Sequence, residues 1–418
     1  MSVLRVRGGE MLRGVIPIHG AKNSALPILA ATLLSCGRCV ICGCPDIADV
    51  RAAGEILRHL GCEVERVGTS LIVDSTGAKA AEIPPELMGK MRASLGFFGA
   101  TLSRFGWGRL CAPGGCRLGA RPVNYHVAAL SALGAEWSQT DSELRCNWEF
   151  RVGGDLTLPF PSVGATETVL LAAVSVPAVV TLHGAAREPE IADLCGFLTA
   201  MGAEISGVGT SDLTVRGGKR LHGAVWRVLP DRMETASYLA AAAAAGGDVT
   251  LTETDPTLLA PVLETLRKAG CRIDTETKKI RLVSDGNLRG VGTVTTAPYP
   301  GFPTDAQAPV MAALLRAKGE SVFCETVFPD RFSHVPELRR FGAEIALHGR
   351  TATVTGVERL SACEAAATDL RGGMAALIAA LCADGVSTLR NIAVLDRGYE
   401  NWVENFRLLG ADVQRTEE

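Results

Sequence analysis

Apolar and polar positions along the chain follow one pattern that recurs six times. Each copy has apolar residues at helical spacing, then a glycine, then a short alternating segment, as in LRHLGCEVE and LTAMGAEI. The glycines stand about 70 residues apart, which is typical of an internal repeat: Gly61, Gly134, Gly202, Gly270, Gly342 and Gly410. The pattern predicts a helix that ends at a left-handed glycine and leads into a strand.

Each repeat also begins with a second helix, which is rich in small apolar residues. We expect these helices at residues 23–34, 91–102, 165–174, 233–245, 306–316 and 372–382. A short strand such as CVICG, VVTLHG or DVTLTE follows each one, and a strand hairpin such as EVERVGTSLIVDS closes the unit. The repeat therefore reads helix, strand, loop, helix, strand, strand, which indicates the α/β fold class.

Six such units exceed what one hydrophobic core accommodates, so we expect two domains of three units each. The stretch RVLPDRME is the expected junction between them. This places the N-terminal domain at residues 21–229, and the C-terminal domain at residues 1–20 plus 230–418. The first strand has no helix of its own, so we expect it to complete the C-terminal domain.

Composition narrows the class of protein. The chain has 418 residues with a net charge of −3, which argues against general binding of nucleic acid. The apolar stretch at residues 169–182 is too short to span a membrane, and the start MSVLRVRGGEMLRGV lacks the features of a secretion signal. A chain of this length does not need its 13 cysteines as disulfides. We therefore expect a cytoplasmic protein with reduced thiols and no obligate protein partner.

One loop stands out for its chemistry. Residues 113–122, PGGCRLGARP, hold three glycines and two prolines, which exclude a regular helix or strand. Cys116 lies at the centre of this loop and is followed by Arg117 and Arg121, whose charges would stabilise a thiolate and attract anions. We interpret Cys116 as a reactive thiol. The alternative, a buried structural cysteine, is expected within an apolar run instead.

Charged and polar residues recur where the small-residue helices begin and in the loops after the strands. Helix starts bind anions through free N–H groups and the helix dipole, so equivalent positions in facing domains would form one anionic site. The alternative is that each residue is a solvated charge at a helix end. The residues concerned are Lys22, Asn23, Arg92, Ser162, Arg232, Glu234, Asp305, Asp369 and Arg371 at the helix starts, and Arg187, Glu188, Arg331, Asp396 and Arg397 in the loops.

A resemblance to a known family rests on motifs that occur in order over nearly the whole chain. They are GAKNSALPILAATLL, MRASLGFFG, PGGCRLGARPV, AAREPEIADL, RVLPDRMET, FPTDAQA, ETVFPDRFSHVPEL, ATDLRGGMAAL and DRGYE. The chain resembles the MurA family of UDP-N-acetylglucosamine 1-carboxyvinyltransferases, which are enolpyruvyl transferases. The resemblance implies two inside-out α/β barrel domains, each of three repeated units, with a cleft between them.

The resemblance also implies the reaction. The enolpyruvyl group of phosphoenolpyruvate is transferred to the 3-hydroxyl of UDP-N-acetylglucosamine with release of phosphate, the first committed step of peptidoglycan synthesis. No metal and no organic cofactor is implied. The sister family that acts on shikimate 3-phosphate lacks the PGGC loop, so Cys116 argues against it.

Residue roles follow from matching positions. Cys116 matches the general acid that also forms a covalent adduct, and Asp305 matches the carboxylate that accepts the proton of the sugar hydroxyl. Lys22, Arg121 and Arg397 match residues around phosphoenolpyruvate, and Lys22 and Arg397 join the catalytic set. The remaining expected substrate contacts are Asn23, Arg92, Pro122, Val123, Ser162, Val163, Gly164, Val327, Arg331 and Arg371.

The chain departs from the family pattern at the expected uridine end. Asn124 and Tyr125 replace the usual Asp-Leu, Phe160 stands in a run where a lysine is common, and Ala48 also replaces a lysine. Two lost cations should weaken contacts to a diphosphate. An alternative function is therefore a non-catalytic or altered-specificity paralogue that binds a sugar nucleotide or a regulatory partner.

Other candidates carry less weight. Cys36, Cys39, Cys42 and Cys44 have a metal-like spacing, but they span a helix end and a strand whose side chains alternate, so their sulfurs should not converge. We predict no metal site. His126, just after the Cys116 loop, is a further candidate for a substrate contact.

Overall fold

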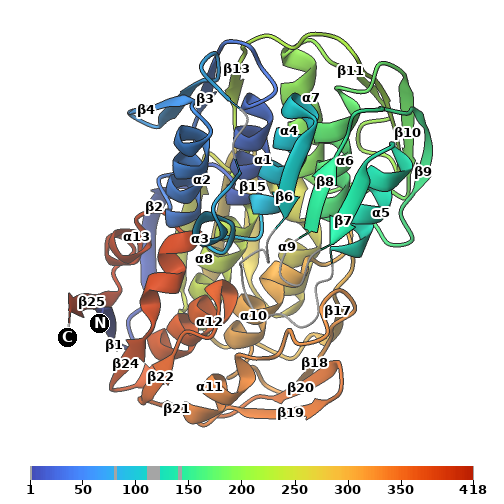
Figure 1. Cartoon of the computed structure of the whole chain (residues 1–418). Coiled ribbons are helices and arrows are strands. Elements are labelled where there is room, and N and C mark those ends of the chain that lie inside the picture. The colour runs from blue at the N-terminus through green and yellow to red at the C-terminus, as the bar shows by residue number, and fades with distance from the viewer. Residues whose placement is uncertain (1, 80–81, 111–122, 140–143, 418) are drawn as a thin grey trace. The chain divides into compact units, whose positions relative to one another are not determined.

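The computed structural model describes residues 2–79, 82–110, 123–139 and 144–417. The fold is mixed α/β, as the sequence pattern predicts, and the chain divides into two compact units (Figure 1). One unit, called here the C-terminal unit, contains the chain up to His19 and the chain from Pro230 onward. The other, the N-terminal unit, contains the described residues from Gly20 to Leu229.

The N-terminal unit holds three successive repeats. Its elements are α1 (Lys22–Thr32), β3 (Arg38–Cys42), α2 (Ala48–His59), β4 (Glu63–Val67), β5 (Ser70–Asp74), α3 (Pro85–Met88), α4 (Ser94–Phe105), β6 (Trp107–Leu110), α5 (Asn124–Ala132), β7 (Glu136–Gln139), β8 (Leu144–Asn147), β9 (Gly154–Thr157), α6 (Val163–Ala173), β10 (Val179–His183), α7 (Pro189–Ala200), β11 (Glu204–Ser206), β12 (Asp212–Arg216) and β13 (Val225–Arg227). Its described strands form separate sheets in the orders β13-β3-β5-β4, β6-β8-β7 and β11-β12-β10-β9.

The C-terminal unit repeats this arrangement. Its elements are β1 (Ser2–Arg7), β2 (Leu12–Pro17), α8 (Arg232–Ala245), β14 (Gly247–Thr252), η1 (Pro256–Leu259), α9 (Ala260–Lys268), β15 (Arg272–Glu276), β16 (Lys279–Ser284), β17 (Gly292–Thr295), α10 (Thr304–Ala313), β18 (Glu320–Cys324), α11 (Val335–Arg340), β19 (Glu344–His348), β20 (Thr351–Thr355), β21 (Leu360–Ser361), β22 (Glu364–Ala366), α12 (Leu370–Leu381), β23 (Ala383–Asp384), β24 (Val386–Arg390), η2 (Ile392–Arg397), α13 (Trp402–Leu408) and β25 (Asp412–Glu417). Its larger sheets have the orders β15-β16-β14-β2, β17-β18-β20-β19 and β22-β24-β1-β25.

The four-stranded sheets share one topology. The strand after the small-residue helix has a parallel neighbour on one side and an antiparallel strand of the hairpin on the other. In the last repeat β1 takes the place of a hairpin strand, because it lies antiparallel between β24 and β25. The two ends of the chain therefore meet in one sheet, which ties the N-terminal segment to the C-terminal unit.

The repeat glycines end their helices as predicted. All six have positive φ, from +87° at Gly61 to +114° at Gly270, a region that other residues rarely adopt. The small-residue helices are also confirmed, each beginning within three residues of its predicted start.

These helices form the buried centre of each unit. In the C-terminal unit α8, α10 and α12 pack against one another, and α12 is buried along its whole length. In the N-terminal unit α4 packs against α1 and α6. A Cβ on Gly99 would lie 3.2 Å from Thr168 Cγ2, so the small residues allow close approach of the helices. Within the described residues, no helix has the length and apolar content needed to cross a membrane.

Candidate active site

In the C-terminal unit, three predicted site residues meet. Asp305 lies in the first turn of α10, where its Oδ1 accepts a hydrogen bond from Arg331 Nη2 at 2.9 Å. Its Oδ2 accepts from Arg371 Nη2 and Nε, at 3.2 and 3.3 Å. Both arginine side chains are 3% exposed, whereas that of Asp305 is 29% exposed. The Asp305 carboxylate is therefore partly exposed to solvent, and two buried guanidinium groups fix its position by hydrogen bonds.

A fourth residue, Glu325, fixes the surroundings of Asp305. Glu325 is buried directly after β18, and its Oε2 accepts from Thr304 Oγ1 at 2.9 Å. Its Oε1 accepts from the backbone N–H of Val327 at 2.8 Å. The loop that carries Val327 is thereby tied to the residue before Asp305. We did not predict this role for Glu325, although it is the first residue of the ETVF motif.

The segment around Arg397 is anchored by its neighbour. Arg397 is half-buried at the end of η2. Asp396 pairs with Arg415 at 2.7 Å and accepts from Trp402 Nε1 at 2.9 Å. Asp396 therefore has a structural role that holds this segment against α13 and β25.

In the N-terminal unit, Lys22 and Asn23 begin α1. Lys22 Nζ lies 2.7 Å from Oδ2 of Asp49, which is buried in the first turn of α2. Asn23 is exposed. Ser24 hydrogen-bonds to Asp193, which also accepts from Trp226 Nε1 at 2.9 Å. These contacts fix the start of α1 so that Lys22 and Asn23 have defined positions.

The N-terminus of α6 is a second candidate contact surface. Ser162 caps the helix by accepting from Ala165 N at 3.4 Å, and Val163 and Gly164 form its first turn. His126, on α5, is buried with its Nδ1 2.9 Å from Thr168 Oγ1. A Cβ on Gly164 would lie 3.3 Å from His126 Cε1, so the His126 imidazole ring packs against this turn. Helix N-termini of this kind bind anions.

Glu167 on the same helix is a residue that the sequence analysis missed. Burial, together with the charges of Glu190 and Glu188, raises the pKa of Glu167 to about 8. Glu190 is buried at the start of α7. The carboxylates of Glu167, Glu188 and Glu190 thus act on one another, and this arrangement favours the protonated form of Glu167. Burial depth, which the sequence does not encode locally, produces this shift.

For several other residues predicted for the site, the structure gives only their place in the fold, and some lie outside the described residues. Arg92 is half-buried in the turn before α4, and Val123 is the N-cap of α5. Of the residues that depart from the family pattern, Asn124 is exposed, and Tyr125, Phe160 and Ala48 are half-buried. The predicted residues Cys116, Arg121 and Pro122 lie outside the described residues.

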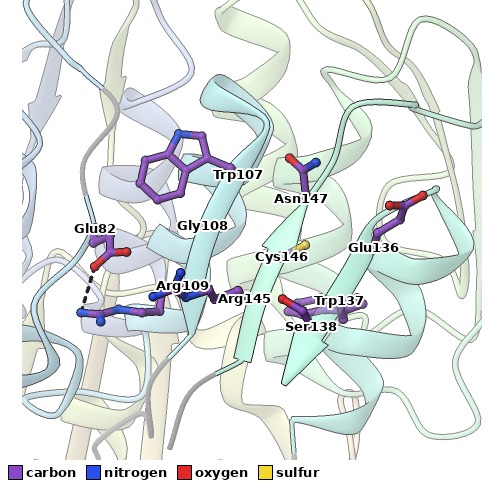
Figure 2. Close-up of a pocket in the computed structure, with 10 residues that line it drawn as sticks. All are labelled: Glu82, Trp107, Gly108, Arg109, Glu136, Trp137, Ser138, Arg145, Cys146 and Asn147. Atoms are coloured by element: carbon purple, nitrogen blue, oxygen red, sulfur yellow. Dashed lines mark ion pairs between the residues drawn. The ribbon is translucent and has the colours of Figure 1, made fainter. Parts of the chain in front are cut away.

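A cavity of about 400 Å³ lies on the β6-β8-β7 sheet, and none of its lining residues in the described part of the chain is one predicted for the site. Figure 2 shows Trp107 and Arg109 of β6 beside it, with Arg109 paired to Glu82 at 3.0 Å. Trp107 is 36% exposed. Among the described residues, no group of three or more His, Cys, Asp or Glu side chains could hold a metal ion.

Comparisons with solved structures define the class of fold. The enolpyruvyl transferase NikO from Streptomyces tendae is similar with a TM-score of 0.90 and 27% identity, over 99% of both chains. An EPSP synthase from Acinetobacter baumannii is similar in fold, with a TM-score of 0.76 and 17% identity over the full length of both chains. The architecture is that of the enolpyruvyl transferases.

Sequence comparisons then identify the family. A family model described as EPSP synthase (3-phosphoshikimate 1-carboxyvinyltransferase) matches residues 6–406, so the chain belongs to this family of enolpyruvyl transferases. UDP-N-acetylglucosamine 1-carboxyvinyltransferase 2 of Caldanaerobacter subterraneus subsp. tengcongensis is 40% identical, over 99% of this chain and all of its own. UDP-N-acetylglucosamine 1-carboxyvinyltransferase of Novosphingobium aromaticivorans is 43% identical over 99% of both chains. These relatives confirm the resemblance that the motifs indicated.

Proposed function

We propose that the protein is a UDP-N-acetylglucosamine 1-carboxyvinyltransferase, which joins the enolpyruvyl group of phosphoenolpyruvate to the 3-hydroxyl of UDP-N-acetylglucosamine and releases phosphate. Full-length identity of 40–43% to enzymes of that name supports this activity. The structural observation that carries the proposal is the carboxylate of Asp305, which Arg331 and Arg371 hold at the edge of solvent. We further propose a cleft between two inside-out barrel domains as its location, and a cytoplasmic enzyme.

The chemistry requires an acid and a base. We assign to Cys116 the proton that adds to the methylene carbon of phosphoenolpyruvate, which makes the neighbouring carbon electrophilic. The sugar 3-oxygen then attacks that carbon and loses its proton to Asp305. When the carbon–oxygen bond to phosphate breaks and the methyl group loses a proton, the enol ether product and phosphate result. Cys116 can also attack the same carbon and form a covalent adduct.

The cations bind the donor. Phosphoenolpyruvate carries a phosphate and a carboxylate, which need several fixed positive groups. We assign Lys22, Arg121 and Arg397 to this role, and Asn23 to the sugar. The backbone N–H groups of the first turn of α6, near Ser162, would serve as donors for the nucleotide diphosphate where the family's usual lysine is absent.

Phosphate release from phosphoenolpyruvate tests the proposal. With UDP-N-acetylglucosamine present, wild-type protein should release phosphate, and Cys116→Ala and Asp305→Ala should each lower kcat by at least about a hundredfold. Shikimate 3-phosphate serves as the control acceptor and should support no release. Folded wild-type protein that releases no phosphate with the sugar nucleotide at saturation would favour the non-catalytic paralogue. Phosphate release with shikimate 3-phosphate, and not with the sugar nucleotide, would indicate that the protein has the activity of the sister family.

A further inference from the structure

Arg371 occupies a position where a cation needs more than one stabilising neighbour. Its side chain is 3% exposed, and it lies in the first turn of α12, where the helix dipole disfavours positive charge. Its carboxylate partner, Asp305, is shared with the equally buried Arg331. If Asp305 accepts a proton during the reaction, both guanidinium groups lose the charge of that carboxylate at that step, and Asp231 remains the other carboxylate that stabilises the charge of Arg371. A buried cation that loses its hydrogen-bonded carboxylate is disfavoured.

Tyr399 supplies a neighbour that does not depend on the charge of Asp305. The guanidinium carbon of Arg371 lies 5.2 Å from the centroid of the Tyr399 ring, within the range of a cation–π interaction. Tyr399 is 2% exposed, so water does not compete for the ring. Burial raises the pKa of Tyr399, so its hydroxyl keeps its proton.

The ring is held in place from α8. Tyr399 Oη lies 2.8 Å from Ser237 Oγ. Ser237 Oγ donates its single proton to the carbonyl oxygen of Met233, also at 2.8 Å, so it accepts from Tyr399. The Tyr399 hydroxyl is therefore fixed to a buried serine, and this contact sets the orientation of the ring beneath Arg371.

We propose that Tyr399 is a positioning residue, oriented by Ser237, which keeps Arg371 in place while Asp305 carries the proton of the acceptor hydroxyl. The role of Asp305 in this statement rests on the proposed function. The ring attracts the guanidinium group whether Asp305 is charged or neutral, and so it makes protonation of Asp305 less unfavourable. Loss of the ring should slow the chemical step and leave substrate binding nearly unchanged.

Three variants separate the ring from its hydroxyl group. Tyr399→Leu removes the ring, whereas Tyr399→Phe keeps the ring and removes the hydroxyl group with its hydrogen bonds to Ser237 and Arg371. Ser237→Ala removes only the contact between the two hydroxyl groups. We expect Tyr399→Leu to lower kcat roughly tenfold, with KM for both substrates within about twofold of wild type. The acidic limb of its kcat profile should move to lower pH, because Arg371 then favours ionised Asp305 more strongly. Tyr399→Phe and Ser237→Ala should stay within about threefold of wild-type kcat.

Other kinetic outcomes would overturn the proposal. A folded Tyr399→Leu variant with the kcat of wild type would do so. A Tyr399→Phe variant whose kcat falls as much as that of Tyr399→Leu would also do so. A rise in KM for phosphoenolpyruvate with unchanged kcat would show that the variant acts through Arg397, two residues away, and not through Arg371.

A double-mutant cycle on stability tests the contact without any activity. In Asp305→Asn protein Arg371 has lost its carboxylate, so it depends more on Tyr399. Tyr399→Leu should therefore lower the free energy of unfolding in urea more in the Asp305→Asn background than in wild type. Equal costs in the two backgrounds would contradict the inference whether or not the wild type releases phosphate. Absence of phosphate release in wild type would count against the proposed function alone.

Discussion

Lys22 Nζ lies 2.7 Å from Asp49 Oδ2, and the two side chains are only 13% and 5% exposed. The pair joins the first residue of α1 to the first turn of α2. In water such a contact contributes little, but here both charges have lost most of their hydration. Asp49 therefore determines where the Lys22 ammonium group lies before any substrate binds.

The variant Asp49→Asn tests this relationship. It leaves the Lys22 charge largely buried without its carboxylate, so the free energy of unfolding should fall by roughly 3 kcal/mol. KM for phosphoenolpyruvate should rise because the ammonium group loses its fixed position. Asp46→Asn is the matched control, since Asp46 pairs with Arg51 at the surface and its loss should cost less than about 1 kcal/mol. Urea unfolding and steady-state kinetics give both readouts, and equal stability of the two variants would contradict the prediction.

The sequence predicted the repeated helices well because two strong local signals coincide there. Small apolar residues mark the buried helix of each unit, and a glycine with positive φ ends the other helix. The pairing of β1 with β24 and β25 joins residues at opposite ends of the chain. The sequence did not predict this pairing. We expected only that the first strand would complete the C-terminal domain, because it has no helix of its own.

The site was less accessible to sequence reasoning. The motifs marked Asp305, Arg331 and Arg371 individually. Arg331 and Arg371 are 26 and 66 positions from Asp305 in the sequence. The contact between Arg371 and Asp305 depends on how α10 and α12 pack. Asp49 was missed entirely, and Tyr399 was noticed only as part of DRGYE. Their importance comes from burial and from which charge lies opposite, and neither property has a local signature in the sequence.

Thiol labelling can test the interpretation of Cys116. Burial raises the pKa of Cys146, Cys195 and Cys382 to about 12, so these thiols should resist iodoacetamide in native protein near pH 7.5. Cys116 should react fastest, and phosphoenolpyruvate should shift its rate profile to higher pH, because the bound anion offsets the positive field of the arginines. Exposed Cys36 is the internal control. Peptide mass mapping measures each site, and a Cys116 profile unaffected by phosphoenolpyruvate would refute the interpretation.

Glu167 should make stability decrease as the pH rises. In the unfolded chain this carboxyl group ionises near its usual pKa of 4.5, but in the folded protein burial and the charges of Glu190 and Glu188 hold the pKa at about 8. The folded state therefore binds more protons between these values, and its stability falls across that interval. Glu167→Gln should gain stability relative to wild type as the pH increases from 5 to 8. Exposed Glu86→Gln should follow wild type, and a Glu167→Gln curve parallel to that of wild type would exclude the Glu167 carboxyl group as the cause.

The ion pair of His19 and Glu234 should contribute a second pH dependence of the same sign. Burial alone would lower the pKa of His19, but the hydrogen bond and charge of Glu234, helped by Glu400 and Asp231, raise it. His19 Nδ1 lies 3.0 Å from Glu234 Oε1, and the backbone N–H of His19 donates to Oε2 at 2.9 Å. The folded protein therefore retains a proton that the unfolded chain loses near pH 6.5. This stabilisation is complete below that pH and disappears as the pH rises through the raised pKa of His19.

His19→Gln should therefore lose stability relative to wild type mainly at low pH, and the difference should narrow as the histidine deprotonates. Urea unfolding at intervals from pH 5.5 to 8.5 measures it. His183→Gln is the control, because His183 pairs with Asp212 at the surface, where solvent screens the charges. A constant difference between His19→Gln and wild type across the whole range would mean that the ring stabilises this segment by packing and not by its charge.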